Sequence, residues 1–421
     1  MTTTTPTPPP VLPSAPPENS RRNLAILILS LAAIVLVASI TNWIGGLIVI
    51  VALFAIVMLH EAGHFVMAKR AGMKVTEFFV GFGPRLWSVR KGETEYGIKA
   101  LPLGGYVRIV GMSNLEQVDP ADEPRSYRQQ GFGDRMGVAV AGSAVHMILA
   151  FLLLVVLLTT VGIYGQPRAI KEFTENSAAE AAGLQVGDRI FALDGRPVND
   201  FDKLRDYVGK RIGKPIAVTV ERDGQRITIP VTPRPTEEEG HTVGRLGYKP
   251  RFPIVHYNPV SAVGKSAETV GRLVVDSLKA LGGFFAPHSI RSYSDNLSNP
   301  ASQPTGSSGG SGGDNGIRFL SPLGIGHVAD QAANAGARAV LLLLISINIF
   351  VGVFNMFPLL PLDGGHVVIA VYERIRSRRG RRYFADVRKM LPYSAALVMV
   401  LGFILITSVY LDVRQPVNLF P

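Results

Sequence analysis

The sequence contains no cysteine among its 421 residues. This absence excludes disulfide bonds, thiol nucleophiles and zinc–thiolate sites, so any metal must be bound by His, Asp or Glu. A domain outside the cytoplasm would fold without covalent cross-links and would need a hydrophobic core of its own. Charged residues are also scarce, at 18%, whereas hydrophobic residues make up 47% and the mean hydropathy is +0.25. This composition favours a membrane protein over a soluble globular one.

The net charge of the chain is +11. A strongly basic balance is one signal of nucleic-acid binding, but much of the charge here stands beside apolar runs. Lys and Arg in such places are typical of the loops that set the topology of a membrane protein. We therefore expect membrane lipids around the chain and no nucleic-acid partner.

Long apolar runs determine the organisation of the chain. The first charge-free run extends from Asn23 to Leu59, which is too long for a single span of about 20 residues. A polar break at Thr41–Trp43 splits it into helices predicted at 24–40 and 44–68. The first helix is an extra N-terminal span or signal anchor. The alternative is the apolar part of a signal peptide that is cleaved near Ala38–Ser39.

The remaining segments follow from composition, periodicity and turn residues. In chain order, the predicted segments are a disordered Pro/Thr-rich cytoplasmic tail (1–22), the extra span or signal anchor (23–43), a span that carries a histidine motif (44–68), a cytoplasmic-side β-hairpin and edge-strand region (69–135), a span (136–164), a small α+β domain (165–236), an extracytoplasmic amphipathic helix and flexible Gly/Ser linker (237–338), a span with a Leu-Asp-Gly motif (339–372), a basic cytoplasmic loop (373–390), a span (391–412) and an extracytoplasmic tail (413–421). The amphipathic helix is predicted at Val260–Phe285 and the linker at Pro287–Gly316.

These segments predict a polytopic α-helical membrane protein with a membrane-associated β-hairpin and an extracytoplasmic α+β domain. It has four spans, the extra N-terminal hydrophobic segment included, and five apolar segments in all when the 24–59 run is split. The positive-inside rule places the region 165–338 outside and the basic ends of the spans in the cytoplasm. The basic residues concerned are Arg21, Arg22, Lys69, Arg70, Arg374, Arg376, Arg378, Arg379, Arg381, Arg382, Arg388 and Lys389.

His60, Glu61 and His64 form an H-E-x-x-H motif at the end of an apolar run. Residues four apart lie on one face of a helix, so His60 and His64 can bind one metal ion through their imidazole nitrogens. Neutral imidazole suits Zn²⁺, and Glu61 is placed to take a proton from a water molecule on the metal. A chance match is the alternative, but ionisable residues at the end of an apolar run are costly and tend to be functional.

A third ligand must come from elsewhere in the chain, and Asp363 is the best candidate. It follows the charge-free run Ala339–Leu362, and the predicted topology places it and the two histidines toward the cytoplasmic ends of their helices. Pro358 and Pro361 break the helix there, and Gly364–Gly365 lets the backbone bend around a site. The alternative is an Asp-Gly turn that ends a helix without binding a metal.

Together these motifs resemble the bacterial site-2 protease family of intramembrane zinc metalloproteases, over about residues 44 to 411. The resemblance rests on two motifs, His60-Glu61-x-x-His64 and Asn355-x-x-Pro358-x-x-x-Leu362-Asp363-Gly364. It implies that His60, His64 and Asp363 bind Zn²⁺ and that Glu61 is the general base. It also implies that Asn355 and Pro358 are substrate-binding residues.

The segments Gly81–Pro84 and Leu101–Val107 resemble the membrane-associated β-hairpin and edge strand of that family. The resemblance implies Gly104 and Gly105 as further substrate-binding residues. An unpaired edge can bind an extended peptide by strand addition. This matters because a helical span hides its peptide bonds and must unwind before hydrolysis. The alternative is an ordinary amphipathic hairpin.

The small domain at 165–236 resembles a PDZ domain, through Ser177–Ile190 and the following Asp194-Gly195 turn. The resemblance implies that it screens or gates substrates from outside and binds an extracytoplasmic peptide, whereas a passive spacer is the alternative. A further segment, Ser321–Gly326, is similar to another part of the family.

One motif departs from the family. Where its second span often has Ala-Gly-Pro-x-x-Asn, this chain has Ala141-Gly142-Ser143-Ala144-Val145-His146. His146 is then a spare ligand, a proton relay or, as we expect, a hydrogen-bonded interior histidine.

The resemblance implies an endopeptidase in the bacterial plasma membrane, with its active site toward the cytoplasmic side and the PDZ-like domain outside. Its implied substrates are single-span membrane proteins, such as anti-sigma factors or remnant signal peptides, cleaved in regulated intramembrane proteolysis. A catalytically silent membrane adaptor is one alternative, but the complete set of motif residues disfavours it. A transporter is another, but the chain has no inverted repeat.

Overall fold

A computed structural model describes residues 20–165, 169–198, 201–238, 241–284, 286–298, 319–377 and 382–417. Outside the described residues lie the predicted N-terminal tail as far as residue 19, residues 299–316 of the predicted linker, Arg378, Arg379 and Arg381 of the basic loop, and residues 418–421 of the predicted C-terminal tail. The chain divides into two compact units: unit 1 combines Met1–Val155 with Val263–Pro421, and unit 2 is Val156–Ala262.

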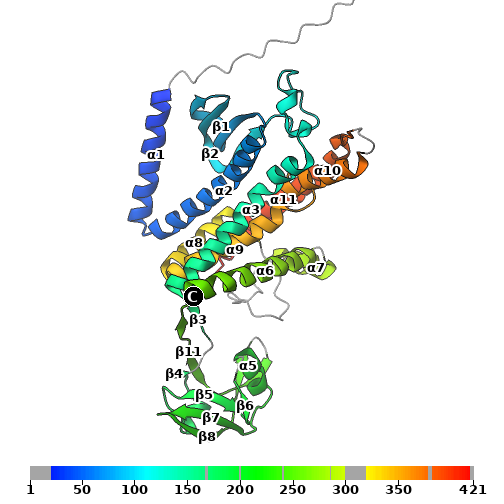
Figure 1. Ribbon diagram of the computed structural model, residues 1–421. Helices are drawn as coiled ribbons and strands as arrows, with labels where there is room; N and C mark the ends of the chain where they lie inside the picture. Colours follow the sequence, from blue (N-terminus) through cyan, green and yellow to red (C-terminus); the bar gives the residue numbers. More distant parts are fainter. Residues whose placement is uncertain are drawn as a thin grey trace, which may run out of the picture. The chain divides into compact units, whose positions relative to one another are not determined.

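Four helices among the described residues are long and apolar enough to cross a membrane. They are α2 (Ile44–Arg70), α3 (Phe132–Val156), α9 (Ala337–Asn355) and α11 (Leu391–Arg414), and α1 (Ser20–Ile40) contains a shorter apolar stretch (Figure 1). Many of their large apolar side chains are exposed or half-buried, and those of α11 are the most exposed, with Ile406 at 71% and Met399 at 68%. Such continuous apolar surface indicates contact with lipid. The predicted polytopic helical fold, with four spans and a fifth, shorter apolar segment, is confirmed.

The polar break that was predicted between the first two helices is a turn. α1 ends at Ile40 and α2 begins at Ile44. Between them, Asn42 has a φ of 56°, in the left-handed region that Asn enters more readily than most residues. The Trp43 backbone N–H donates to Ala38 O at 2.7 Å, which closes the turn.

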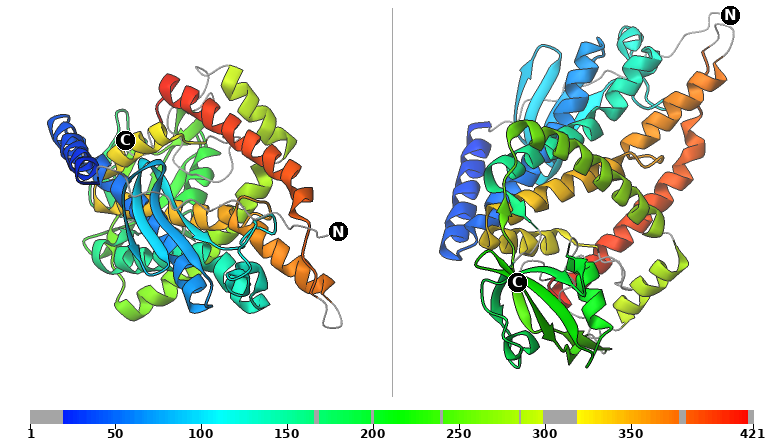
Figure 2. Two further views of the ribbon diagram at one scale, coloured as in Figure 1. Left: turned by 90° about the horizontal axis from the view of Figure 1, so that it is seen from above. Right: turned by 60° about the horizontal axis from the view of Figure 1, so that its bottom comes forward.

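The β-hairpin of unit 1 consists of β1 (Val75–Lys91) and β2 (Thr94–Ile109), and it lies beside α2 (Figures 1 and 2). Val80 pairs with Gly105 on one side and with Ile98 on the other, so both long strands bend and the hairpin folds back on itself. The segment 105–109 pairs with β1 along one side and forms an outer edge. A Cβ at Gly105 would lie 2.6 Å from Met58 Sδ of α2, so glycine lets this edge approach the helix closely.

Helix α8 (Pro322–Ala335) is an element that the sequence analysis did not predict, although Ser321 and Pro322 are typical of a helix start. The Ser321 hydroxyl accepts hydrogen bonds from the Leu323 and Gly324 backbone N–H groups. α8 packs against α2 and α9. The buried apolar residues at this contact are Val49, Ile56, Ala329 and Leu344.

The region after unit 2 is more helical than predicted. The predicted amphipathic helix is α6 (Pro259–Phe284), but the linker does not begin at Pro287, because Pro287–Ser298 forms α7. Tyr293 of α7 shares a 2.6 Å hydrogen bond with Thr407 of α11. Composition alone indicated a linker here, whereas this contact between distant segments favours a helix.

Unit 2 is rich in β-structure and has a hydrophobic core of its own, as a cysteine-free domain requires. Its central antiparallel sheet has the strand order β6-β5-β7-β8. The elements are β3 (Ile163–Tyr164), β4 (Ala169–Phe173), α4 (Ala178–Ala181), β5 (Arg189–Leu193), β6 (Arg196–Pro197), α5 (Phe201–Gly209), β7 (Ile216–Arg222), β8 (Gln225–Val231), β9 (Arg234–Glu238), β10 (His241–Arg245), β11 (Tyr248–Arg251) and β12 (Ile254–Val255). The core includes Ile170, Ala179, Leu204, Ile216, Val218, Val220 and Val231.

The unit continues past residue 236, where the sequence analysis ended the domain. β11 pairs with β4, joining Tyr248 to Phe173, and β12 pairs with β3. These late strands carry no strong alternation of apolar and polar residues, and their partners lie far away in the sequence. The domain end was therefore not visible in the local pattern.

Candidate metal centre

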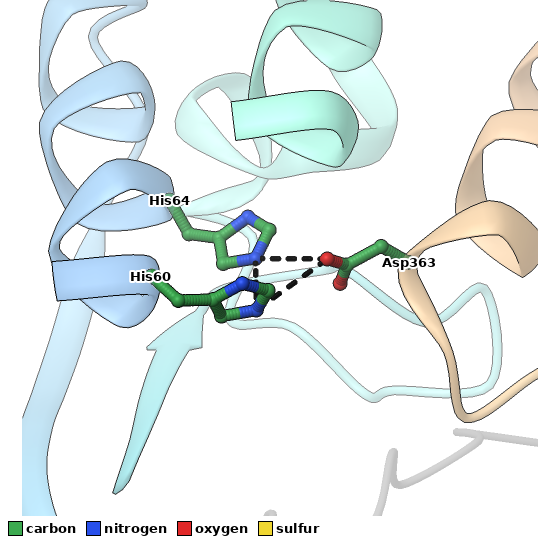
Figure 3. Close-up of side chains that lie close together, drawn as sticks. All are labelled: His60, His64 and Asp363. Atoms are coloured by element: carbon green, nitrogen blue, oxygen red, sulfur yellow. Dashed lines mark hydrogen bonds and ion pairs between the residues drawn. The ribbon is translucent and has the colours of Figure 1, made fainter. Parts of the chain in front are cut away.

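The H-E-x-x-H motif lies in the last three turns of α2, where both histidines are buried. Four residues of helix bring His60 and His64 to the same face. Their rings meet edge to face with centroids 4.8 Å apart, and the two Nε2 atoms are 3.2 Å apart. Both nitrogens point toward Asp363 (Figure 3).

Asp363 is the first residue of α10 (Asp363–Arg376), which follows α9 after a tight turn. Glycine is required at the next two positions because the turn passes close to them. A Cβ at Gly364 would lie 2.2 Å from Met356 O, and one at Gly365 would lie 2.5 Å from Leu360 N. The turn thereby brings Asp363 Oδ2 to 3.5 Å from His60 Nε2 and 3.3 Å from His64 Nε2 (Figure 3).

The three ligand atoms fit a zinc ion. Zinc–nitrogen and zinc–oxygen bonds of about 2.0–2.1 Å in a tetrahedral site place neighbouring ligand atoms roughly 3.3 Å apart. The three separations here, 3.2, 3.3 and 3.5 Å, match that spacing. Asp363 Oδ2 is moreover buried without a hydrogen-bond partner, which is costly for a carboxylate unless a cation binds it. Three protein ligands leave a fourth position for water or substrate, as in catalytic zinc sites.

The backbone of α3 supports both histidines. His64 Nδ1–H donates to Val138 O at 2.7 Å, and this bond leaves Nε2 unprotonated and free to bind a metal. One turn further along α3, a Cβ at Gly142 would lie 2.3 Å from His60 Cε1 and 2.5 Å from His64 Nε2. Glycine at position 142 is what makes room for the two rings.

Glu61 lies on α2 beside the metal ligands and is half-buried. Its carboxylate is within hydrogen-bond reach of the Val107 backbone, in the edge segment of β2. The candidate base and the outer edge of the hairpin are therefore neighbours.

The other predicted site residues fall into two groups. Asn355 ends α9 and Pro358 lies in the turn before Asp363, so both are close in the chain to a metal ligand. Gly104, with a φ of 136°, lies at the bend of β2, and Gly105 packs against α2. The positions suit contact with a peptide, but their substrate-binding role stays a prediction.

His146 is an interior histidine with a hydrogen bond, as expected. It is 1% exposed, and its Nδ1 lies 3.0 Å from Asn348 Oδ1 of α9. Its ring centroid is 5.0 Å from that of His60. Among the described residues, the cluster able to bind a metal consists of His60, His64 and Asp363 without His146.

Sequence reasoning missed a buried ion pair at the other end of α10. Arg135 Nη1 of α3 lies 2.7 Å from Glu373 Oε2, with the side chains 9% and 3% exposed. Asn114 Nδ2 and the Ala385 N–H both donate to Glu373 Oε1, at 2.9 and 2.6 Å. The helix that begins with Asp363 is thus also fixed at its far end. The sequence offered one indication of this pair, because Glu373 is an acidic residue at the start of the predicted basic loop.

Comparison with known proteins extends these observations. The model of peptidase family M50 matches residues 48–401. The chain is similar to the zinc metalloprotease Rip1 of Mycobacterium tuberculosis, with 32% identity over 414 residues that cover 89% of this chain and 98% of that protein. Metalloprotease MmpA of Caulobacter vibrioides is 30% identical over 409 residues, which cover 87% and 95% of the two chains.

Among solved structures, the PDZ domain of an SdrC-like protein from Listeria monocytogenes covers 21% of this chain and 90% of its own. The TM-score is 0.18 and the sequence identity 15%. A likeness at this level carries no argument about the fold. The PDZ-like interpretation of unit 2 therefore rests on its sequence motif.

Proposed function

Because the chain belongs to peptidase family M50 and is a zinc metalloprotease of that family, we propose that it cleaves single-span membrane proteins at or within the bilayer. One observation carries this proposal: His60 and His64 project from a span, α2, and Asp363 follows another, α9, after the turn of residues 356–362. A site built from such elements is accessible to peptide bonds at membrane depth.

The chemistry divides between the metal and the chain. His60, His64 and Asp363 would hold the zinc ion, which would supply Lewis acidity toward water and toward the substrate carbonyl. Glu61 accepts the proton of the attacking water and passes a proton to the departing amine, as a general base and then a general acid. The burial of His60 and His64, at 7% and 5% exposure, limits the access of bulk water to these steps.

Substrate binding involves the hairpin edge and the α9–α10 turn. The outer edge of segment 105–109 can pair with an extended peptide, and Val107 lies in reach of Glu61. A peptide added to this edge would bring its bonds toward the metal ligands. Gly104 and Gly105 keep the edge close to α2, and Asn355 and Pro358 would contact the substrate from the α9–α10 turn.

The orientation of the chain follows from the positions of its basic residues. Lys69 and Arg70 end α2, and Arg374 and Arg376 lie in the last turn of α10. The positive-inside rule places these ends, and with them the metal centre, toward the cytoplasm of a bacterial plasma membrane. Unit 2 would then lie outside, where a PDZ-like domain can screen substrates by binding a peptide.

The proposed class of substrate comes from the family resemblance, and this arrangement is compatible with it. Proteins with one span, such as anti-sigma factors or remnant signal peptides, can unwind locally and present an extended segment to the edge. The protease would then act in regulated intramembrane proteolysis.

The test is cleavage of a tagged single-span reporter that is co-expressed with the wild type or with Glu61→Gln. This substitution keeps the size of the side chain and removes the base. We expect a shortened reporter with the wild type and about 10²–10⁴-fold less with the variant. Equal cleavage by both proteins would show that Glu61 is not the base. A panel of reporters, trimmed and untrimmed outside the membrane, none of which is cleaved, would contradict the proposed substrate class.

A further inference from the structure

His146 makes a hydrogen bond whose direction can be assigned. Asn348 Nδ2 donates to Leu344 O at 2.8 Å within α9, so its Oδ1 is left to accept. His146 Nδ1 lies 3.0 Å from that oxygen and must therefore carry the proton. Both side chains are buried, at 1% and 0% exposure. In an apolar bundle an unpaired polar group at either position would be costly.

This hydrogen bond lies next to one of the metal ligands, His60. The His146 ring centroid lies 5.0 Å from the His60 ring centroid, at an angle of 45°. His146 is one helical turn from Gly142, the residue that makes room for His60 and His64. Helix α3 thus contacts both histidine ligands at Gly142 and, one turn later, contacts α9 through the hydrogen bond of His146.

Helices α3 and α9 also approach each other closely beside His146. A Cβ at Gly352 would lie 2.9 Å from His146 Cβ and 2.4 Å from Met147 Cε, so glycine permits the helices to touch there. Gly352 lies in the last turn of α9, just before the turn that leads to Asp363. The distance between α3 and α9 at this crossing therefore bears on how far Asp363 lies from the histidines.

We propose that His146 and Asn348 are positioning residues that join the two halves of the metal centre and set its affinity for zinc. One half is the α2–α3 pair with His60 and His64, and the other is the α9–α10 turn with Asp363. The hydrogen bond fixes the crossing of α3 and α9, and the imidazole of His146 fills the space beside His60. The inference rests on the zinc site of the proposed function and not on its substrate class.

The test is a zinc competition titration of the purified full-length chain against a chelator of known affinity. His146→Phe keeps a ring without the donor, and Asn348→Leu keeps the shape without the acceptor. We expect each to weaken zinc binding about 10–100-fold, the typical effect of losing a residue that orients metal ligands. The double variant should bind no more weakly than the weaker single variant, because both changes remove the same hydrogen bond.

His146→Gln and Tyr293→Phe serve as the matched variants. Gln keeps an N–H donor and should retain affinity closer to the wild type than Phe does. Tyr293→Phe removes the hydrogen bond to Thr407, also between helices but outside the metal centre, and should leave the affinity unchanged. If the two residues had only a structural role, His146→Phe and Asn348→Leu would lower the unfolding temperature but would leave the zinc affinity of the folded chain unchanged.

Unchanged zinc affinity in both single variants would overturn the proposal, and so would losses that add in the double variant. If His146→Phe does not fold, Asn348→Leu decides the question, with the visible absorption of the Co²⁺-substituted protein as the second readout. A changed Co²⁺ spectrum of Asn348→Leu supports the proposal, and a wild-type spectrum of that variant contradicts it. Because no substrate is used, a failed reporter assay leaves this result intact.

Discussion

The two units of this chain are stabilised in different ways. Unit 2 has a conventional core of buried Val, Ile, Leu and Ala side chains. The helices of unit 1 leave many of their apolar side chains exposed or half-buried, and several of their buried contacts are polar, including His146–Asn348 and Arg135–Glu373. Lipid is as apolar as a leucine side chain, so burial contributes little between spans and polar contacts determine how helices meet.

The metal centre depends on this difference. Its ligands come from helices whose relative positions are set by hydrogen bonds, an ion pair and glycine contacts. In unit 1, changes to a few polar or glycine positions should therefore affect metal binding. In unit 2, changes to the core should lower the stability of that unit without changing metal binding.

The largest expected effect is that of Glu373→Ala, which leaves the buried Arg135 without its partner. Breaking a buried ion pair from one side typically costs about 3–5 kcal/mol. We expect a lower unfolding temperature of the purified chain together with weaker zinc binding, because α10 carries Asp363. Glu268→Ala, which removes an exposed pair with Lys265 on α6, is the control and should change neither.

A core substitution in unit 2 tests whether that unit is stabilised by its apolar core independently of the metal centre. Ile216→Ala should cost about 2–5 kcal/mol, because Ile216 is fully buried among apolar side chains. Hydrogen exchange of the full chain should show faster exchange in the β5–β7–β8 strands, with zinc affinity unchanged. Ile227→Ala, at a position that is 36% exposed, serves as the control. Loss of zinc in the Ile216 variant would contradict the separation of the two units.

Gly142→Ala probes the metal centre with a single methyl group. The new Cβ would lie 2.3 Å from His60 Cε1, so a ligand ring or α3 must move. We expect zinc affinity to fall about 10–100-fold. Gly264→Ala on α6, where a Cβ meets nothing within 4 Å, should have no effect on the titration. Equal affinities of the two variants would show that the crowding at position 142 is relieved without cost.

The smallest expected effect is a pH dependence of unit 2. Burial alone would raise the pKa of Asp188, but hydrogen bonds from Arg222 and from the Gln185 N–H hold it below its usual value. A carboxylate whose pKa is lowered by folding contributes stability above its unfolded pKa of about 3.9, and this contribution is lost as the pH falls through the folded pKa. Unit 2 should therefore lose stability below about pH 4, as measured by hydrogen exchange. Asp188→Asn should weaken the dependence of unit 2 stability on pH. An unchanged pH dependence in this variant would contradict the role given to Asp188.

Local patterns were sufficient to predict the parts of the molecule that depend on neighbours in the chain. Hydropathy identified the spans, and the four-residue spacing of His60 and His64 placed both on one face of a helix. Pro358 and Gly364–Gly365 indicated the bend at Asp363, and the structure places the three ligand atoms together.

The features that were missed depend on contacts between distant segments. α7 is held by a hydrogen bond to α11, and β11 of unit 2 closes against β4. The pairing of Arg135 with Glu373 and the matching of His146 to Asn348 also join residues more than 200 positions apart in the sequence. Neither periodicity nor composition contains that information, so the polar contacts that connect the helices of unit 1 became visible only in the fold.

The most direct test of the account is the zinc content of the purified full-length chain, measured by mass spectrometry of the metal together with the protein concentration. We predict one zinc per chain in the wild type and in Glu61→Gln, because Glu61 is not a ligand, and a loss of most of the zinc in Asp363→Ala. Full zinc in Asp363→Ala, or none in a folded wild type, would contradict a metal centre made of His60, His64 and Asp363.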